Sequence, residues 1–149
     1  MNYILKFFLM IILLTSCGYQ PMLSSKKINF TYNDLKLLGD KNLSQEIGSN
    51  LKSFQNDSSE TQIEISSEII KNIISKDEKG NPNVLGLSLI VNIKIFGDKE
   101  IEKNFIETIS YNTNNNKFKL KQFERRQISN LAQKLSKDIY IYLNSQLKI

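Results

Sequence analysis

Alternating apolar and polar residues predict a long β-hairpin in the second half of the chain. Residues 84–96 and 100–112 both place apolar side chains at every second position, which is the period of a strand with one buried face. A shift of the pairing by one residue would turn one apolar set to the opposite side of the sheet. An odd-length loop that pairs Ile95 with Ile101 keeps both sets on one face, so we expect this register.

Two further strands are predicted upstream of this hairpin. Residues 26–33 alternate and are expected to form a short first strand. Residues 61–75 alternate until the phase changes at Ile69 and Ile70, which indicates a bulge or burial on both faces. The Lys-Gly-Asn-Pro sequence at residues 79–82 is typical of a turn and joins this strand to the hairpin.

Two segments carry apolar residues at helical spacing. The first is residues 42–55, and Asn42 is expected to cap its start. The second is expected to begin near Lys119 or Lys121 and to continue to Leu147. The apolar stripes consist of Leu43, Ile47, Leu51 and Phe54 in the first helix and of Ile128, Leu131, Leu135, Ile139 and Tyr142 in the second.

The order of these elements is β-α-β-β-β-α. It predicts an α+β fold, a two-layer sandwich in which a roughly four-stranded, mostly antiparallel sheet carries both amphipathic helices on one face. The other sheet face is then uncovered and has a mixed character, with isoleucines and Phe96 among serine, asparagine, threonine and charged side chains. This face is either an ordinary solvated surface or a surface that a partner covers.

The chain begins with a short apolar run. Residues 4–14 are apolar except for Lys6, which is the length of a signal-peptide core and too short to span a bilayer comfortably. The sequence Leu-Thr-Ser-Cys that follows at residues 14–17 resembles the bacterial lipobox. This resemblance implies cleavage between Ser16 and Cys17 and acylation of Cys17.

We therefore expect a signal peptide at residues 1–16, a lipidated tether at residues 17–25 and a single α+β domain at residues 26–149. Several acyl chains on Cys17 would hold the domain stably on a membrane surface. A conventional signal peptide, or an uncleaved anchor with an incidental cysteine, is the alternative interpretation.

Composition narrows the possible functions. The formal net charge is +5, and the positive charges are too few and too interspersed to indicate a nucleic-acid partner. The sequence has no histidine, which is the commonest general base and metal ligand, and it has no nucleophile, metal or phosphate-loop motif. We therefore expect no catalytic residues, no metal and no cofactor other than the acyl groups on Cys17.

Two further stretches carry family features. Residues 17–22, Cys-Gly-Tyr-Gln-Pro-Met, and residues 118–120, Phe-Lys-Leu, with Glu124 and Arg125 after them, resemble the opening and closing segments of the LPS-assembly lipoprotein family LptE, especially its alphaproteobacterial branch. The order of elements is similar over nearly the whole domain. Gly18 is also similar to the residue that follows the acylated cysteine in outer-membrane lipoproteins.

The resemblance implies a lipid-anchored outer-membrane protein that faces the periplasm. It would plug and help to assemble LptD, the β-barrel that inserts lipopolysaccharide, and it would bind lipopolysaccharide. Lys94, Lys99 and Lys103 are candidate ligands for the lipid phosphates, although lysines on a solvated sheet are common. An accessory lipoprotein of another envelope assembly or transport machine is the alternative function, and a lipid- or glycan-active enzyme has the least support.

Replacing the candidate lipidation residue tests the anchor. We expect Cys17→Ser to abolish acylation and to leave unprocessed precursor, because a serine hydroxyl provides no thiol for the diacylglycerol group. Mass spectrometry of the membrane fraction measures both effects. Normal processing of the Cys17→Ser variant would contradict the lipoprotein prediction.

Overall fold

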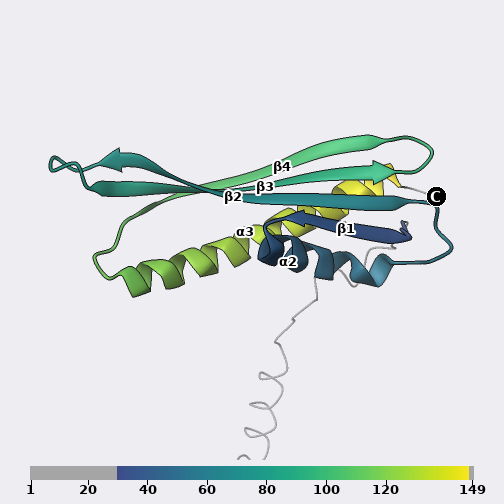
Figure 1. The fold of residues 1–149 in the computed structure, drawn as a ribbon, viewed down its shortest axis with the longest axis horizontal. Helices are drawn as coiled ribbons and strands as arrows, with labels where there is room; N and C mark the ends of the chain where they lie inside the picture. The colour runs from purple at the N-terminus through teal and green to yellow at the C-terminus, as the bar shows by residue number, and fades with distance from the viewer. Residues whose placement is uncertain (1–29, 148–149) are drawn as a thin grey trace, which may run out of the picture.

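The computed structural model describes residues 30–147, which form one four-stranded sheet and two long helices (Figure 1). The strands lie side by side in chain order, β1-β2-β3-β4; β1 runs parallel to β2 and the other pairs are antiparallel. The elements are β1 (Asp34–Gly39), α2 (Lys41–Leu51), the 3-10 turn η1 (Lys52–Phe54), β2 (Gln62–Lys76), β3 (Pro82–Phe96), β4 (Ile101–Asn112) and α3 (Lys117–Gln146).

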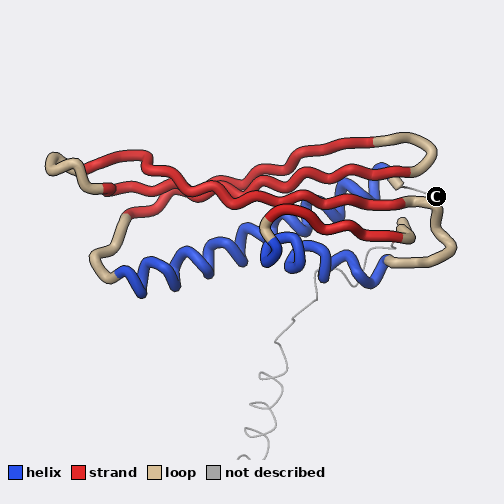
Figure 2. The backbone as a smooth tube through the Cα atoms, viewed as in Figure 1, coloured by secondary structure: helices blue, strands red, loops and turns tan. Residues whose placement is uncertain are grey.

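Both helices cover the same face of the sheet (Figures 1 and 2). The predicted α+β class, the order of elements and the two-layer arrangement are therefore confirmed. Helix α2 packs beneath β1 and β2, whereas α3 packs beneath β3 and β4. No helix among residues 30–147 is long and apolar enough to cross a membrane.

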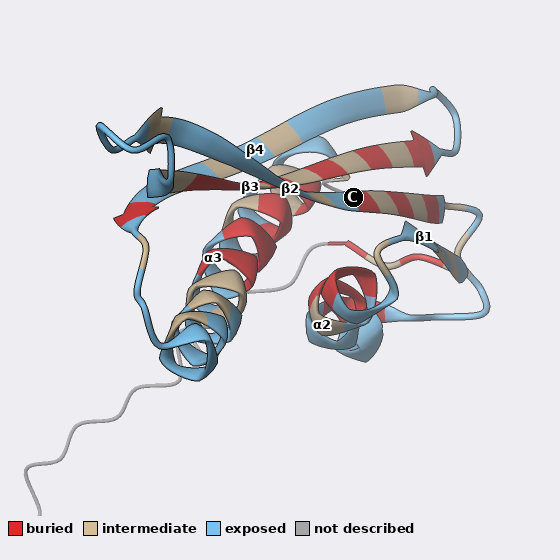
Figure 3. Ribbon diagram, turned by 60° about the vertical axis from the view of Figure 1, so that its left-hand side comes forward, coloured by how far each residue is buried: buried red, intermediate tan, exposed pale blue. Residues whose placement is uncertain are grey.

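The predicted register of the long hairpin is also confirmed. Ile95 pairs with Ile101, and the same register places Ile90 opposite Ile106 on the uncovered face. From Leu87 to Ile95 every second residue of β3 is buried against the helices, and the alternation is visible along β2 and β3 in Figure 3. The core consists of Phe30, Tyr32, Leu43, Ile47, Leu51, Phe54, Ile63, Ile65, Leu87, Leu89, Val91, Ile93, Ile95, Tyr111, Leu131, Ala132, Leu135, Ile139, Tyr140 and Leu143.

The position predicted for the first strand is wrong. The strand lies at residues 34–39, and Tyr32 makes only an isolated bridge to Gln55. Tyr32 is nevertheless fully buried, and its hydroxyl donates a hydrogen bond to the carbonyl oxygen of Leu51 at 3.1 Å. The alternation near Tyr32 therefore reflects burial under the end of α2 and not pairing with a strand. Residues 26–29 lie outside the described residues.

Both helices begin at residues other than those predicted. Asp40, and not Asn42, caps α2: its carboxylate accepts a hydrogen bond from the backbone N–H of Leu43 at 2.9 Å. Helix α3 begins at Lys117, because Asn116 caps it by accepting from the backbone N–H of Lys119 at 3.0 Å. Short polar side chains just before a helix determine where it starts. Here α2 begins one residue before its predicted start, and α3 begins two to four residues before its predicted start.

The predicted irregularity in β2 lies elsewhere along the strand. Ile69 and Ile70 pair regularly with Leu89 and Ser88, and Ile70 is exposed on the uncovered face, so these two residues form neither a bulge nor a doubly buried segment. The register instead shifts between Ile73 and Lys76, close to the turn that leads into β3.

A tight junction joins β1 to α2. Gly39 has a φ of +81°, and a Cβ atom there would lie 2.0 Å from the carbonyl oxygen of Ser67 on β2. The hydroxyl of Ser67 donates to the Asp40 carbonyl oxygen at 3.1 Å and lies 2.6 Å from that of Ser44, the first buried polar residue of α2. Glycine is required here because any side chain would force β1 away from β2.

The docking of α3 depends on its buried stripe. Leu135 is 1% exposed, whereas Ile141 on the same helix is 44% exposed. We expect Leu135→Asp to prevent folding, because burial of an unpaired carboxylate costs several kcal/mol. The matched variant Ile141→Asp should remain folded. Thermal unfolding followed by circular dichroism measures both variants, and a cooperative, near-native transition for Leu135→Asp would contradict the packing of α3.

Candidate functional site

The sheet face that the helices leave uncovered has a distinctive pattern of polar and apolar side chains. Polar side chains form a ladder across β3 and β4 on this face. Asn92 donates to Glu102 at 2.7 Å and to Asn104 at 2.8 Å, and the hydroxyls of Ser88 and Thr108 lie 3.0 Å apart. These bonds connect β3 and β4 across the uncovered face.

Apolar side chains interrupt this polar ladder. Ile106 is 60% exposed and lies opposite Ile90, and Ile70 on β2 is diagonal to Ile90. Three isoleucines from three adjacent strands therefore form a diagonal apolar cluster, bordered by hydroxyl and amide groups and by Glu68, which lies opposite Ile90. We call the uncovered side of β2, β3 and β4 the open face, and the cluster is its apolar centre.

The candidate lipopolysaccharide ligands do not share one side of the sheet. Lys94 lies on the open face, where its ammonium group is 3.8 Å from the Glu102 carboxylate. Lys103 pairs with Ile93, whose side chain is buried against the helices, so Lys103 lies at the edge on the helix side. Lys99 is in the loop between the strands. The three lysines thus surround one end of the sheet and do not form a single cluster.

A cleft with a mixed polar and apolar lining lies beside this loop. Its volume is about 550 Å³, and Lys99, Asp98 and Gly97 line it together with hydroxyl and amide side chains of residues 56–61. The lining residues come from four separate parts of the chain: Thr31, residues 56–61, residues 95–101, and Gln146 and Leu147 at the end of α3. Ser16 and Cys17, the predicted cleavage and acylation residues, lie outside the described residues.

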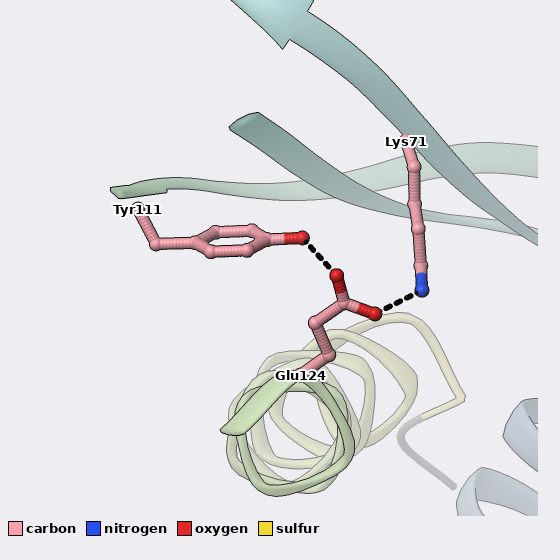
Figure 4. A network of polar contacts seen from close by, with 3 residues as sticks. All are labelled: Lys71, Tyr111 and Glu124. Atoms are coloured by element: carbon pink, nitrogen blue, oxygen red, sulfur yellow. Dashed lines mark hydrogen bonds and ion pairs between the residues drawn. The ribbon is translucent and has the colours of Figure 1, made fainter. Parts of the chain in front are cut away.

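On the helix side, three residues form a polar link that the sequence did not indicate (Figure 4). The Glu124 carboxylate on α3 accepts a hydrogen bond from the Tyr111 hydroxyl on β4 at 2.7 Å and forms an ion pair with Lys71 on β2. The sequence contains one indication of this link: Lys71 lies between Ile69 and Ile73, the apolar residues two positions before and after it on the same face of β2. The link fastens the first half of α3 to two strands at once.

Electrostatics fix the protonation of this link. Burial alone would raise the pKa of Glu124, but hydrogen bonds from Lys71 and Tyr111 and the charge of Lys71 lower it below its usual value of 4.5. Burial and the adjacent Glu124 carboxylate raise the pKa of Tyr111 far above its usual value. At neutral pH the carboxylate therefore stays charged and the phenol stays protonated, which suits a structural link and not proton transfer.

Lysines, and not the arginines of α3, pair with the two carboxylates near the start and middle of this helix. Glu124 bonds to Lys71, and Glu107 on β4 accepts from Lys134 at 2.8 Å. Both carboxylates are thus bonded to lysines, and the neighbouring Arg125 and Arg126 are exposed. Among residues 30–147, no group of acidic or cysteine side chains is arranged to hold a metal ion.

The geometry defines an α+β sandwich with one covered and one open sheet face, and solved structures share this fold. No family model matches the chain, and no curated protein matches it. The fold matches rare lipoprotein B from Shewanella oneidensis with a TM-score of 0.63 and 13% sequence identity, over 76% of this chain and 95% of that chain.

Two further bacterial structures match. Lipoprotein B from Nitrosomonas europaea has a TM-score of 0.56 at 13% identity, over 89% of this chain and 99% of that chain. A minor lipoprotein from Acinetobacter baumannii has a TM-score of 0.50 at 18% identity, over 74% of this chain and 94% of that chain. At these identities the likeness establishes the fold.

The link between Glu124, Tyr111 and Lys71 makes stability depend on pH. Because folding lowers the pKa of Glu124, its contribution is fully present above the unfolded value near 4.5 and is lost as the pH falls through the lower folded value. We expect Glu124→Gln to lower stability at pH 7 by about 1–2 kcal/mol. The variant should also lose less stability than the unmodified chain on acidification below pH ~4.5.

Urea unfolding at pH 7 and at lower pH measures both effects. Glu107→Gln is the matched control, since it breaks the pair with Lys134, whose side chain is 59% exposed. This control should change stability less than Glu124→Gln does. An equal loss in the two variants at pH 7 would show that the link to Tyr111 and Lys71 contributes nothing beyond a surface ion pair.

Proposed function

We propose that this chain is an outer-membrane lipoprotein that plugs and helps to assemble an LptD-type β-barrel and binds lipopolysaccharide during its insertion into the outer leaflet. The observation that carries the proposal is the combination of a lipobox at residues 14–17 with a fold that matches rare lipoprotein B over 95% of that chain. The acyl groups would be attached to Cys17 and would hold the domain on the periplasmic side of the membrane.

The open face is the proposed contact with the barrel. A barrel lumen is lined by polar side chains, so a plug needs a surface that offers hydrogen bonds together with some apolar area. The open face has both, in the ladder around Asn92 and the cluster of Ile70, Ile90 and Ile106. The helices bury their apolar stripes in the domain's own core, so the open face is free to bind a partner.

The three lysines near the β3–β4 loop are the proposed contacts with lipopolysaccharide. Lys94, Lys99 and Lys103 surround one end of the sheet, where they can meet phosphate groups that approach from either side. Lys94 would have to exchange its 3.8 Å pair with Glu102 for a phosphate. A phosphate offers stronger charge-assisted hydrogen bonds than this loose contact does.

Co-purification from outer membranes tests the partner. A chain tagged at its C-terminus should recover one large β-barrel of the LptD type at stoichiometric yield from mild detergent. We expect Ile106→Asp to reduce this recovery about tenfold, because a charge placed in the apolar centre of a contact costs more than 1.4 kcal/mol. Ile141→Asp is the matched control, since it changes an exposed isoleucine on α3 and should leave the recovery unchanged.

Each outcome of this experiment separates the candidate functions. Loss of the barrel with Ile106→Asp alone supports the open face as the contact. Equal recovery of the barrel with both variants would contradict the open face as the contact surface, while the barrel would remain the partner. Recovery of a different envelope complex would favour the accessory role in another assembly or transport machine.

A further inference from the structure

The first ten residues of α3, Lys117–Arg126, carry a strong positive charge. Five of them are lysine or arginine, and Glu124, which is already paired with Lys71, is the one acidic residue among them. The basic residues, all exposed, are Lys117, Lys119, Lys121, Arg125 and Arg126. Positive charges at the start of a helix are opposed by the helix dipole, so these residues do not serve the stability of α3.

Apolar side chains project from the same segment. Phe118 is 75% exposed, the largest exposed fraction among the exposed large apolar residues of the described chain. Residues seven apart lie on the same side of a helix, because seven residues make about two turns. Phe118 therefore shares one side with Arg125, and Lys119 shares the adjacent side with Arg126. Both sides point away from the sheet. Glu124, which faces the sheet, marks the opposite side. The outer side of this half-helix thus carries Phe118 and three cations, Lys119, Arg125 and Arg126. Lys117 and Lys121 lie seven and three residues before Glu124 and share its side of the helix.

Nothing within residues 30–147 packs on this outer side. Helix α2 lies beside only the later part of α3, where Ser129 donates to Glu46 at 2.9 Å and Asn50 donates to Ser136 at 3.1 Å. The first half of α3 extends beyond α2, as Figure 1 shows. We call the outer side of residues 117–126 the cationic helix surface.

We propose that the cationic helix surface binds the interface of an anionic phospholipid bilayer, with Phe118 inserted among the lipid headgroups. A helix surface with lysine and arginine around an exposed aromatic ring has the composition of interfacial membrane segments. The cations are attracted to anionic headgroups, and the ring gains free energy by leaving water. This inference rests on the proposed lipid anchor at Cys17 but not on the barrel partner.

The length of the chain before the domain permits this contact. Phe30, where the described residues begin, packs against Tyr140 on α3 with ring centroids 6.1 Å apart. Phe118 precedes Tyr140 by 22 helical residues, or roughly 33 Å along the axis. The segment from Cys17 to Phe30 reaches roughly 45 Å when fully extended. The acyl groups on Cys17 can therefore lie in the bilayer while α3 lies on the same bilayer surface. The anchor also raises the effective concentration of α3 at that surface, which favours its binding.

The experiment uses the full acylated chain and a single tryptophan. The sequence has no tryptophan, so Phe118→Trp introduces one fluorophore at the proposed contact. Acylation is first verified by mass, and the protein is reconstituted into vesicles with brominated acyl chains that contain either phosphatidylglycerol or only phosphatidylcholine. We expect about threefold stronger quenching in the anionic vesicles, and weaker quenching when the salt concentration is raised.

Two controls make the result specific. Ile106→Trp places the fluorophore on the open face, on the other side of the sheet from the helices, and should show little quenching in either vesicle. Adding Lys119→Glu, Arg125→Glu and Arg126→Glu to Phe118→Trp should abolish the difference between the vesicles. These side chains are exposed, so the fold should persist.

The possible failures are distinguishable. Acylated protein whose Phe118→Trp fluorescence is unquenched, or equally quenched in anionic and neutral vesicles, would overturn the proposed surface and leave the lipid anchor intact. Protein without acyl mass would contradict the anchor itself.

Discussion

The structure depends on a sheet that buries only one of its faces. The strands β2 and β3 are 15 residues each, and alternate residues of the paired strands must all point to the helix side for the core to form. This requirement fixes the register of β2, β3 and β4 and dictates that both helices lie on one side. It also exposes the opposite face, which is why an uncovered surface and a hydrophobic core arise from the same alternation.

Polar contacts attach the part of α3 that apolar packing does not hold against the sheet. Apolar packing places α3 beneath β3 and β4, but its first half carries few buried residues. The link from Glu124 to Tyr111 and Lys71 attaches this half of α3 to the sheet. Glu124 is the only carboxylate of residues 117–126, and in this link it faces the sheet. The side of this segment that faces away from the sheet therefore carries Lys119, Arg125, Arg126 and the exposed ring of Phe118, and no carboxylate. The orientation of Glu124 toward the sheet thus accounts both for the link to Tyr111 and Lys71 and for the positive charge on the outer side of α3.

Much of this fold was predictable from the sequence, because long alternating strands and helical stripes are set by burial. The pairing of Ile95 with Ile101 followed from the need to keep both apolar sets on one side. The first strand was misplaced because Tyr32 is buried by a helix end, and periodicity does not distinguish that from a strand. The link to Lys71 was not predictable, because it joins residues 53 positions apart through a geometry that only the packed helix creates.

The short length of β1 has a consequence for the behaviour of the chain in crowded surroundings. It pairs with β2 only from Gln62 to Ser67, so the outer backbone edge of β2 from Glu68 onward has no neighbouring strand among residues 30–147. Such an edge is a template for uncontrolled strand addition and aggregation. Lys71, Lys76 and the irregular pairing after Ile73 provide the charge and distortion that oppose a regular incoming strand. The same lysine that holds α3 in place thereby helps to keep separate copies of the protein apart.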